Sequence, residues 1–316
     1  MFNFIVNSKV SIAFAGTPDF SLPSLEGLYN SKYHIPIVFT QPDRPYGRGR
    51  SIRESKISSF AKKANLDIIK PENLDNIDIK SLPKVDFFVV VAYGLIIPER
   101  MLNWPRLAPI NVHASLLPKW RGSSPIQRSL LADDAETGIS IMRMESTLDT
   151  GPVYSSRSLA IKENYDSEDL HQILSGEGAK LLLETLSRII INDLKPIPQQ
   201  NNLASYAHKI SKSESKVVWS KSARFIELQV RSFKPWPTCS AKLSDGRTFK
   251  LINAKAVDTK TNLLPGNIVS LNKETIHVAT GSGILEISKI QKPGGKPVSI
   301  KEYLNAHSFI GVTFVD

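Results

Sequence analysis

The chain has 316 residues, of which 41% are hydrophobic and 22% are charged, and its formal net charge is +10. This composition is typical of globular proteins and excludes wholesale disorder, and the length predicts two domains that each bury a core. The single cysteine, Cys239, excludes an internal disulfide framework and zinc sites of the CxxC type.

Neither a membrane span nor a secretion signal is expected. The longest nearly uninterrupted apolar run, Phe87 to Pro98, is too short to cross a bilayer as a helix. Residues 1–10 lack the basic segment, apolar stretch and small-residue cleavage site of a signal peptide. We therefore expect a soluble protein of the cytoplasm.

The positive charge is concentrated in the last third of the chain. Residues 1–205 contain 23 Lys and Arg against 22 Asp and Glu, a net charge of +1, whereas residues 206–316 contain 17 against 8, a net charge of +9. A neutral catalytic domain followed by a module that binds a polyanion such as a nucleic acid has this pattern. A basic domain that is merely soluble has the same pattern, so charge alone leaves both interpretations open.

Strands and helices alternate through the first 190 residues. A short apolar strand is predicted at Val10–Ala15, and the pair Thr17-Pro18 after it is typical of a helix N-cap and first helical position. The next predicted elements are strand Ile35–Thr40, helix Ser55–Ala64, strands Val85–Ala92 and Pro109–Ala114, an apolar run Gly138–Met144 and helix Ser167–Asn192. This alternation predicts an α/β domain with a doubly wound, mostly parallel, Rossmann-like sheet, whose ligands bind beyond the carboxyl ends of the strands.

After residue 194, long alternating strands and helices give way to a polar stretch and then to short runs of alternating polar and apolar residues. Residues 195–208 are polar and contain prolines, which is typical of a linker. A helix is predicted at Ser222–Ser232, and short alternating runs follow at Ser240–Leu243, Thr248–Ala256, Asn267–Leu271, Thr275–Ala279 and Ile284–Ile290. Five short strands predict a smaller β-barrel of the oligonucleotide-binding (OB) type. The predicted domains are therefore 1–194 and 209–316, joined by the linker 195–208.

Three polar residues stand at the ends of apolar runs. Asn111 and His113 are two positions apart in a strand, so their side chains leave the same face. Asp149 follows the run Gly138–Met144 and returns beside His113 if that run joins the sheet. A carboxylate beside an imidazole stabilises its charged form and fixes its tautomer, and an asparagine amide both donates and accepts hydrogen bonds.

The same residues also have a purely structural interpretation. A histidine at a strand end is commonly a satisfied structural residue, and an aspartate before Thr-Gly commonly closes a turn through its own backbone. The run Leu116-Leu117-Pro118 commonly ends a strand within a core. From the residues alone, both the structural and the catalytic interpretation stay open.

The order of these residues carries a resemblance. The string Asn111–Gly122 (NVHASLLPKWRG), followed by Leu148–Gly151 (LDTG), resembles the signature of the folate-dependent formyltransferases. Further matching segments are Phe14–Pro18, Thr40–Pro45, Val91–Ile96 and Pro235–Pro237. The Thr40–Pro45 segment and the basic C-terminal domain favour, within that family, the enzymes that formylate methionyl-tRNA.

This resemblance implies an enzyme without a metal that transfers the formyl group of 10-formyltetrahydrofolate to the α-amino group of methionyl-initiator tRNA, and it points to a monomer. It implies Asn111, His113 and Asp149 as catalytic residues. It also places two segments against the folate, which consist of Ser115, Leu116, Leu117 and Pro118 and of Val91, Ala92, Tyr93, Gly94, Leu95 and Ile96. One departure is Ser146-Thr147, where family members often carry an acidic residue and a glycine.

The densest basic stretch of the first domain lies within residues 41–56 and contains Arg44, Arg48, Arg50 and Arg53. Its glycines let the backbone approach a nucleic acid, and its arginines offer forked donors to phosphates and bases. A solvated surface loop has the same composition. The resemblance favours contact with the acceptor stem of the tRNA, with Arg44 as the main specificity residue and a loop that becomes ordered on RNA binding.

Two other functions share some of these features. A folate formyltransferase that acts on a small amine needs the same first domain, but it needs no barrel with a charge of +9. An RNA-binding protein with an inactive enzyme-like domain does not need Asn111, His113 and Asp149. A nicotinamide dehydrogenase is excluded, because the segment Ala15–Asp19 after the first strand lacks the GxGxxG cradle for a pyrophosphate.

Overall fold

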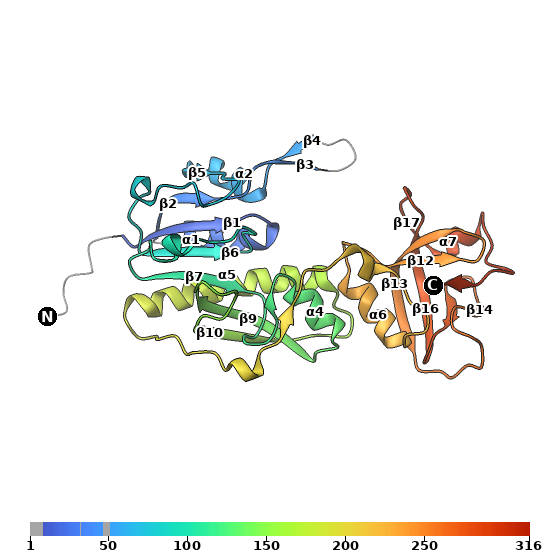
Figure 1. Cartoon of the computed structure of the whole chain (residues 1–316). Helices are drawn as coiled ribbons and strands as arrows, with labels where there is room; N and C mark the ends of the chain where they lie inside the picture. The colour runs from blue at the N-terminus through green and yellow to red at the C-terminus, as the bar shows by residue number, and fades with distance from the viewer. Residues whose placement is uncertain (1–8, 32, 47–50) are drawn as a thin grey trace. The chain divides into compact units, whose positions relative to one another are not determined.

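The computed structural model describes residues 9–31, 33–46 and 51–316. The chain forms two compact units, each with its own buried core (Figure 1). The first unit contains most of the chain up to Ala207. The second contains His208–Asp316 together with two short earlier segments, Ile126–Ala135 and Ile161–Leu170.

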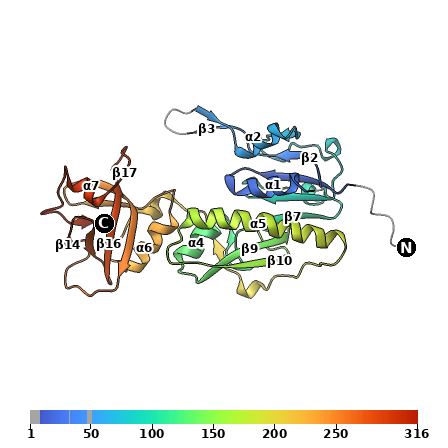
Figure 2. The same ribbon diagram turned by 180° about the vertical axis from the view of Figure 1, so that it is seen from behind.

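The first unit is built on a seven-stranded sheet with the strand order β10-β9-β7-β6-β1-β2-β5 (Figures 1 and 2). Its strands are β1 (Ser11–Gly16), β2 (His34–Phe39), β5 (Ile68–Ile69), β6 (Phe87–Val91), β7 (Ala108–His113), β9 (Glu136–Arg143) and β10 (Val153–Ala160). Five neighbouring strands run parallel to one another, namely β7, β6, β1, β2 and β5. Strand β9 pairs antiparallel with both β7 and β10. The predicted α/β class with a mostly parallel sheet is confirmed.

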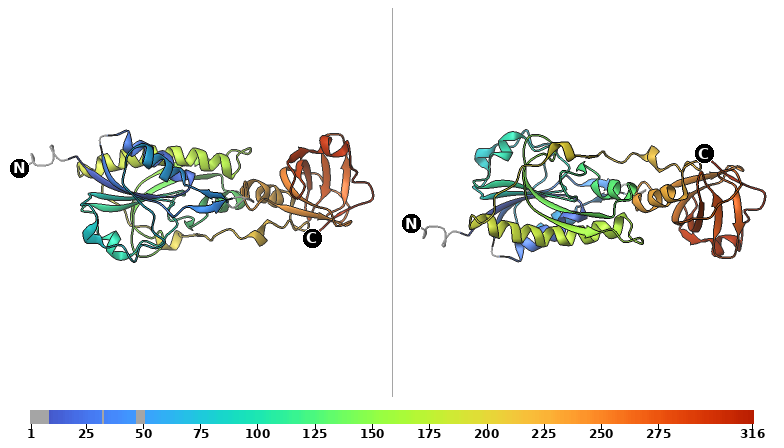
Figure 3. Two further views of the ribbon diagram at one scale, coloured as in Figure 1. Left: turned by 90° about the horizontal axis from the view of Figure 1, so that it is seen from above. Right: turned by 90° about the horizontal axis from the view of Figure 1, so that it is seen from below.

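Other elements cover both faces of this sheet, because its central strand β6 has side chains on both faces and all of them are buried. All five residues of β6 are buried. One face packs on the segment that contains η2 (Ile79–Ser81) and α3 (Glu99–Leu102). The other face packs on α5 (Ser167–Ile190), where the small Gly178 lets the helix approach β7 (Figure 3).

The turn after β1 differs from the prediction. No helix starts at Thr17-Pro18; Pro18 is instead the N-cap of the 3-10 turn η1 (Asp19–Ser21), and α1 follows (Leu22–Tyr29). The Thr17 hydroxyl donates to the carbonyl oxygen of Tyr93 at 3.1 Å and accepts the N–H of Gln41 at 3.2 Å. The side chain that was expected to cap a helix therefore joins the ends of three strands.

The remaining elements of the first unit are short. They are β3 (Arg44–Tyr46), β4 (Ser51–Arg53), α2 (Lys56–Lys63), β8 (Arg121–Gly122), η3 (Asn201–Leu203) and β11 (Tyr206–Ala207). β3 and β4 form a hairpin, and β11 pairs in parallel with β8.

The second unit is a curled antiparallel sheet with the strand order β14-β15-β16-β13-β12-β18, with β17 beside β16 (Figure 3). Its strands are β12 (Ser240–Leu243), β13 (Thr248–Val257), β14 (Ile268–Leu271), β15 (Ile276–Ala279), β16 (Ile284–Gln291), β17 (Pro297–Ser299) and β18 (Phe314–Val315). Its helices are α4 (Pro125–Leu131), η4 (Lys212–Ser215), α6 (Ala223–Ser232) and α7 (Ile300–Leu304). The predicted smaller, OB-like domain is confirmed, and only the two shortest strands, β17 and β18, had no counterpart in the sequence pattern.

The core of the second unit is apolar and contains the one cysteine. Trp219 and Phe314 pack with a ring-centroid distance of 4.8 Å, and Cys239 is fully buried in the same cluster. Burial raises the pKa of the Cys239 thiol, which keeps it a small apolar residue rather than a nucleophile. Within the described part of the chain, no helix has the length and apolar character of a membrane span.

Candidate active site

The strand β7 brings Asn111 and His113 to one face of the sheet, next to β9. Val112 between them points the other way, toward Gly178 of α5. β9 pairs with β7 so that Ser140 lies opposite His113. The apolar run before Asp149 therefore does join the sheet, which is the condition that Asp149 needs in order to return beside His113.

The imidazole of His113 lies between two oxygen acceptors. Its Nε2 lies 2.9 Å from the carbonyl oxygen of Trp120, and its Nδ1 lies 3.7 Å from Oδ2 of Asp149. A carbonyl oxygen only accepts, so Nε2 carries a proton. Nδ1 faces the carboxylate of Asp149, so the two ring nitrogens lie toward two different acceptors. The side chains of His113 and Asp149 are 7% and 12% exposed, so little solvent screens this interaction.

The amide of Asn111 is half-buried, and within the described residues no group forms a hydrogen bond with it. A half-buried amide without a partner retains its full capacity to donate and accept. It lies on the same face of β7 as His113, so both side chains leave the sheet on the same side.

The turn that carries Asp149 has a demanding backbone. Asp149 has φ +54°, in the left-handed region, and its Oδ2 accepts the backbone N–H of Gly122 at 2.8 Å. A Cβ on Gly151 would lie 2.0 Å from the carbonyl oxygen of Arg143, so only glycine fits there. The turn fixes the backbone of Asp149, and Gly122 of β8 holds its carboxylate.

The departure at Ser146-Thr147 lies on the exposed side of this turn. The Thr147 hydroxyl lies 2.5 Å from the hydroxyl of Thr150, which in turn lies 3.3 Å from the Thr147 carbonyl oxygen. A glycine at position 147 has no hydroxyl to close the turn in this way. In this chain, a side-chain hydrogen bond therefore supplements the backbone of the turn.

The Ser115–Pro118 segment forms a loop that is closed on itself. The Ser115 hydroxyl donates to the carbonyl oxygen of Lys119 at 2.5 Å. The Ser140 hydroxyl on β9 donates to the Ser115 carbonyl oxygen and accepts the N–H of Leu117. Leu116 occupies the space that a side chain at Gly138 would fill, since a Cβ there would lie 2.5 Å from its Cδ2. Leu116, Leu117 and Pro118 remain half-buried and present an apolar wall.

The Val91–Ile96 segment, at the carboxyl end of β6, divides into core and surface residues. Val91 and Tyr93 are buried in the core, and burial raises the pKa of Tyr93. Ala92 and Gly94 are exposed with φ +46° and +82°, and Ile96 is 91% exposed. Leu95 is half-buried. The side chains of Thr17 and Gln41 already bind the Tyr93 carbonyl oxygen, so the structure leaves the exposed backbone at Ala92 and Gly94 and the side chains outside the core available for a ligand.

The basic hairpin is described only at its base. Arg44 is exposed in β3 and pairs with Arg53 of β4 along the backbone. Arg48 and Arg50, two predicted tRNA contacts, lie outside the described residues, and of Arg53 only the backbone is described.

A network of ion pairs anchors the hairpin at this base. Lys70 lies 2.7 Å from Asp43, which precedes β3, and 3.6 Å from Glu54, which follows β4. Glu54 also lies 2.6 Å from Lys62 of α2. The hydrogen bonds from Lys62 and Ser58 lower the pKa of Glu54 to about 2. The network ties both ends of the hairpin to the body of the unit.

Sequence reasoning missed Arg121, Gln199 and Asn201. Arg121 is 3% exposed and hydrogen bonds to both amides, and Gln199 donates to the backbone on either side of Thr150. Gln199 and Asn201 lie in the segment that was predicted as a linker. The amide-rich run 199–202 was the available signal, because side-chain amides are well suited to bind backbone groups.

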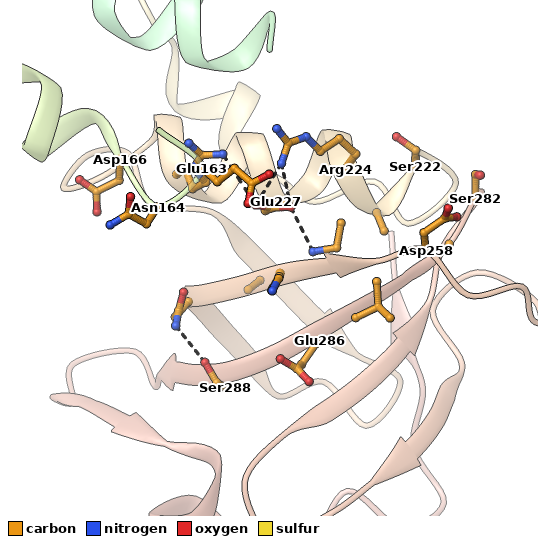
Figure 4. Close-up of a pocket in the computed structure, with 18 of the residues that line it drawn as sticks. Glu163, Asn164, Asp166, Ser222, Arg224, Glu227, Asp258, Ser282, Glu286 and Ser288 are labelled. Atoms are coloured by element: carbon orange, nitrogen blue, oxygen red, sulfur yellow. Dashed lines mark hydrogen bonds and ion pairs between the residues drawn. The ribbon is translucent and has the colours of Figure 1, made fainter. Parts of the chain in front are cut away.

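A separate cavity of about 780 Å³ lies in the second unit, between α6 and the strands β13 and β16 (Figure 4). Its buried charges already have partners: Arg231 donates to the carbonyl oxygens of Tyr165 and Lys162, and Glu227 accepts the N–H of Ala256. Five acidic and four basic side chains line it. In a strongly basic unit this balance does not fit a polyanion site, and the contacts support a structural role.

In the residues that the structure describes, no cluster of His, Cys, Asp and Glu is arranged to hold a metal ion. The polar groups beside His113 are amides, carbonyls and one carboxylate, and this donor set suits hydrogen bonding to an organic substrate.

Known proteins resemble the chain over nearly its whole length. Residues 8–186 match the family model described as "Formyl transferase", and residues 209–308 match "Formyl transferase, C-terminal domain". A methionyl-tRNA formyltransferase of Coxiella burnetii (strain RSA 493 / Nine Mile phase I) is 44% identical over 302 residues, which cover 95% of this chain and 96% of that protein. The chain belongs to the methionyl-tRNA formyltransferase family. The resemblance that the motifs indicated is thereby confirmed.

Further relatives agree with this family. The methionyl-tRNA formyltransferase of Legionella pneumophila (strain Paris) is 41% identical over 302 residues, with 95% of this chain and 96% of that protein covered. An N-formyltransferase from Helicobacter canadensis, solved with folinic acid and dTDP-3-aminofucose, has a TM-score of 0.68 at 19% identity and covers 88% of this chain and 98% of that chain. HypX from Aquifex aeolicus, solved with tetrahydrofolic acid, has a TM-score of 0.61 at 15% identity. The match covers 94% of this chain and 47% of the HypX chain. These two structures share the fold.

Proposed function

We propose that the protein transfers the formyl group of 10-formyltetrahydrofolate to the α-amino group of methionyl-initiator tRNA, which supplies formylmethionyl-tRNA for translation initiation. The observation that carries this proposal is the 44% identity to a methionyl-tRNA formyltransferase over 95% of the chain. The amide, imidazole and carboxylate beside the end of β7 suit the chemistry that this reaction requires.

The reaction moves one carbon between two nitrogens. The neutral amine of the methionyl ester attacks the formyl carbon and forms a tetrahedral intermediate with a negative oxygen. Collapse of this intermediate breaks the bond to the folate nitrogen, and the proton lost by the amine is transferred to that nitrogen. Preorganised donors aimed at the developing negative charge contribute most to such a reaction.

Asn111 and His113 are the proposed donors to the oxyanion. The half-buried Asn111 amide has the free donor capacity for this role. When both ring nitrogens are protonated, His113 offers its Nδ1–H, because at 3.7 Å from Asp149 this group is not yet committed to a short hydrogen bond. Asp149 stabilises the charged ring and assists removal of the proton from the attacking amine.

The folate is proposed to lie between the Ser115–Pro118 loop and the loop Ala92–Ile96. The half-buried Leu116, Leu117 and Pro118 supply an apolar wall for the flat ring system. The exposed backbone of the second loop, where Ala92 and Gly94 have positive φ, supplies donors and acceptors for the polar edge of the ring.

The tRNA is proposed to contact the basic hairpin and the second unit. Alternation along the strands leaves Lys242 of β12, Lys250 of β13 and Lys289 of β16 exposed on the second unit. Such lysines hold phosphates and orient the RNA without reading its sequence. In this arrangement residues 1–194 are the catalytic domain and 209–316 the tRNA-binding domain of a cytoplasmic monomer.

A formylation assay with three amine acceptors tests the proposal. Charged initiator tRNA, charged elongator methionyl-tRNA and free methionine are compared at equal concentrations with 10-formyltetrahydrofolate. We expect rapid formylation of the initiator alone. Equal formylation of small free amines would instead support an enzyme that acts on a small molecule, and no formylation of any acceptor would support an inactive RNA-binding protein.

A further inference from the structure

The segment Ile197–Ala207, here called the strap, contacts two parts of the site: the turn that carries Asp149 and the short strand β8 that follows the Ser115–Pro118 loop. At one end, Ile197 exchanges two backbone hydrogen bonds with Val153, of 2.8 and 2.9 Å, just beyond the Asp149 turn. At the other end, Ser205 accepts the N–H of Arg121 at 2.9 Å, and Ala207 pairs with Gly122 through β11 and β8. The strap therefore joins two loops that are about thirty positions apart in the sequence.

Gln199 is the residue of the strap that holds the Asp149 turn. Its Nε2 donates to the carbonyl oxygens of Asp149 at 2.9 Å and Gly151 at 2.6 Å. These two carbonyls belong to the peptide groups Asp149–Thr150 and Gly151–Pro152, so one amide group fixes the orientation of two peptide planes in the turn. The left-handed backbone of Asp149, with φ +54°, is unfavourable for a residue with a side chain and needs such support.

Arg121 fixes the orientation of the Gln199 amide. Its Nε and Nη2 donate to Oε1 of Gln199 at 3.1 and 2.9 Å, and its Nη2 also donates to Oδ1 of Asn201 at 2.8 Å. A guanidinium only donates and a carbonyl oxygen only accepts. The Gln199 amide therefore has one allowed orientation, with its oxygen toward Arg121 and its nitrogen toward the turn.

The same strand holds the carboxylate of Asp149. Gly122, directly after Arg121, donates its N–H to Oδ2 of Asp149 at 2.8 Å. A Cβ at Gly122 would lie 2.7 Å from the carbonyl oxygen of Ala207, so the strap approaches this strand as closely as a glycine allows. One hydrogen-bond network, formed by Arg121, Gly122 and Gln199, thus holds both the backbone and the carboxylate of Asp149.

We propose that Gln199 and Arg121 are positioning residues, which hold Asp149 at the distance from His113 that formyl transfer requires. This inference rests on the proposed function, since it assigns Asp149 a part in that reaction. Both residues act on the substrate only through Asp149. A misplacement of a catalytic group by about 1 Å lowers a rate by about 10²-fold.

The test compares Gln199→Ala, Gln199→Glu and the control Gln200→Ala in the full-length protein. Gln200 is an exposed glutamine next in the chain, and its side chain has no hydrogen bond within the described residues. We expect Gln199→Ala to lower kcat about 10- to 100-fold with less than about a twofold change in KM for folate and for tRNA. Gln200→Ala should match the wild type.

Gln199→Glu separates the two roles of Gln199, which are to hold the Asp149 turn and to bind Arg121. A glutamate keeps the bonds from Arg121 but cannot donate to the carbonyl oxygens of Asp149 and Gly151. We expect its kcat to fall at least as far as that of Gln199→Ala. Wild-type kcat in Gln199→Glu would overturn the proposal, because anchoring of Arg121 would then be the only role of Gln199.

A spectroscopic measurement works without turnover. In protein with ¹⁵N-labelled histidine, we expect the ring resonances of His113 to shift in Gln199→Ala and to stay in place in Gln200→Ala, with thermal unfolding of both variants near that of the wild type. Unchanged His113 resonances in a folded Gln199→Ala would contradict the positioning role. If the wild type formylates no amine, the proposed function fails, while this measurement still decides whether Gln199 controls the pair.

Discussion

At the scale of single residues, His113 and Asp149 are the pair proposed to carry the chemistry, so replacing either one has a defined signature. His113→Ala removes the proposed oxyanion donor, and Asp149→Asn removes the charge 3.7 Å from the ring. We expect either change to lower kcat about 10²- to 10³-fold and to leave tRNA affinity within about twofold. Single-turnover formylation and filter binding measure the two quantities. Near-normal formyl transfer by either variant contradicts the assignment.

A second residue-scale prediction concerns Gly151 in the Asp149 turn. A methyl group there meets the Arg143 carbonyl oxygen at 2.0 Å, whereas one at Gly176 of α5 meets nothing within 4 Å. We expect Gly151→Ala to lower the free energy of unfolding by about 1–3 kcal/mol and to reduce activity. Gly176→Ala should raise it by up to about 1 kcal/mol, since alanine favours a helix over glycine. Urea denaturation compares the two, and equal effects would show that the turn relaxes freely.

At the scale of elements, the base of the basic hairpin depends on the charge of Glu54. Its pKa in the folded protein is about 2, below its ordinary value near 4.5, because Lys62 and Ser58 hydrogen bond to it. A lowered pKa stabilises the fold when the carboxylate is charged in both states. The contribution is therefore complete above pH 4.5 and is lost as the pH falls toward 2.

Glu54→Gln tests this dependence. Because the pair is near the surface, we expect the variant to lose only about 1 kcal/mol of unfolding free energy at pH 7 and to approach the wild type near pH 2.5. Denaturant titrations at several pH values measure the difference. Glu72→Gln is the control, since Glu72 is an exposed carboxylate without an ion pair among the described residues. A difference that stays constant with pH rejects the role of the charge.

The elements also show what the sequence could predict. The uninterrupted apolar run of β6 and the i, i+2 spacing of Asn111 and His113 in β7 predict a buried parallel strand and a shared face, because period and burial are local properties. The strap could not be predicted in this way. Gln199 binds carbonyl groups about fifty positions away, and a hydrogen bond to a backbone group leaves no periodic pattern in the sequence.

Thr17 shows the same limit at a strand end. Its sequence neighbours match a helix N-cap, but its hydroxyl instead binds the backbone of the loop after β6. A capping residue has two possible partners, the following helix or a distant loop, and only the assembled sheet decides between them. Local signals therefore predicted the strands well and the ends of the strands less well.

At the scale of the whole molecule, the uneven charge predicts how salt acts on the two substrates. Residues 206–316 have a net charge of +9, against +1 for residues 1–205. Lysines that neutralise phosphates release counterions from the RNA, so log K for tRNA should fall linearly with log salt, by about 0.7–0.9 per phosphate contacted. The proposed folate site consists of an apolar wall and backbone groups, so the affinity for folate should fall much less.

Arg44→Leu measures the contribution of one hairpin arginine in the same experiment. Arg44 is exposed at the hairpin base, so the variant should fold normally and keep its KM for folate. If Arg44 contacts a phosphate, the salt slope for tRNA falls by about one and the KM for tRNA rises. The remaining slope then reports the other contacts, which are those of the remaining hairpin arginines and of the lysines on the second unit. Equal losses for folate and tRNA would show that Arg44 supports the fold of the site and does not bind RNA.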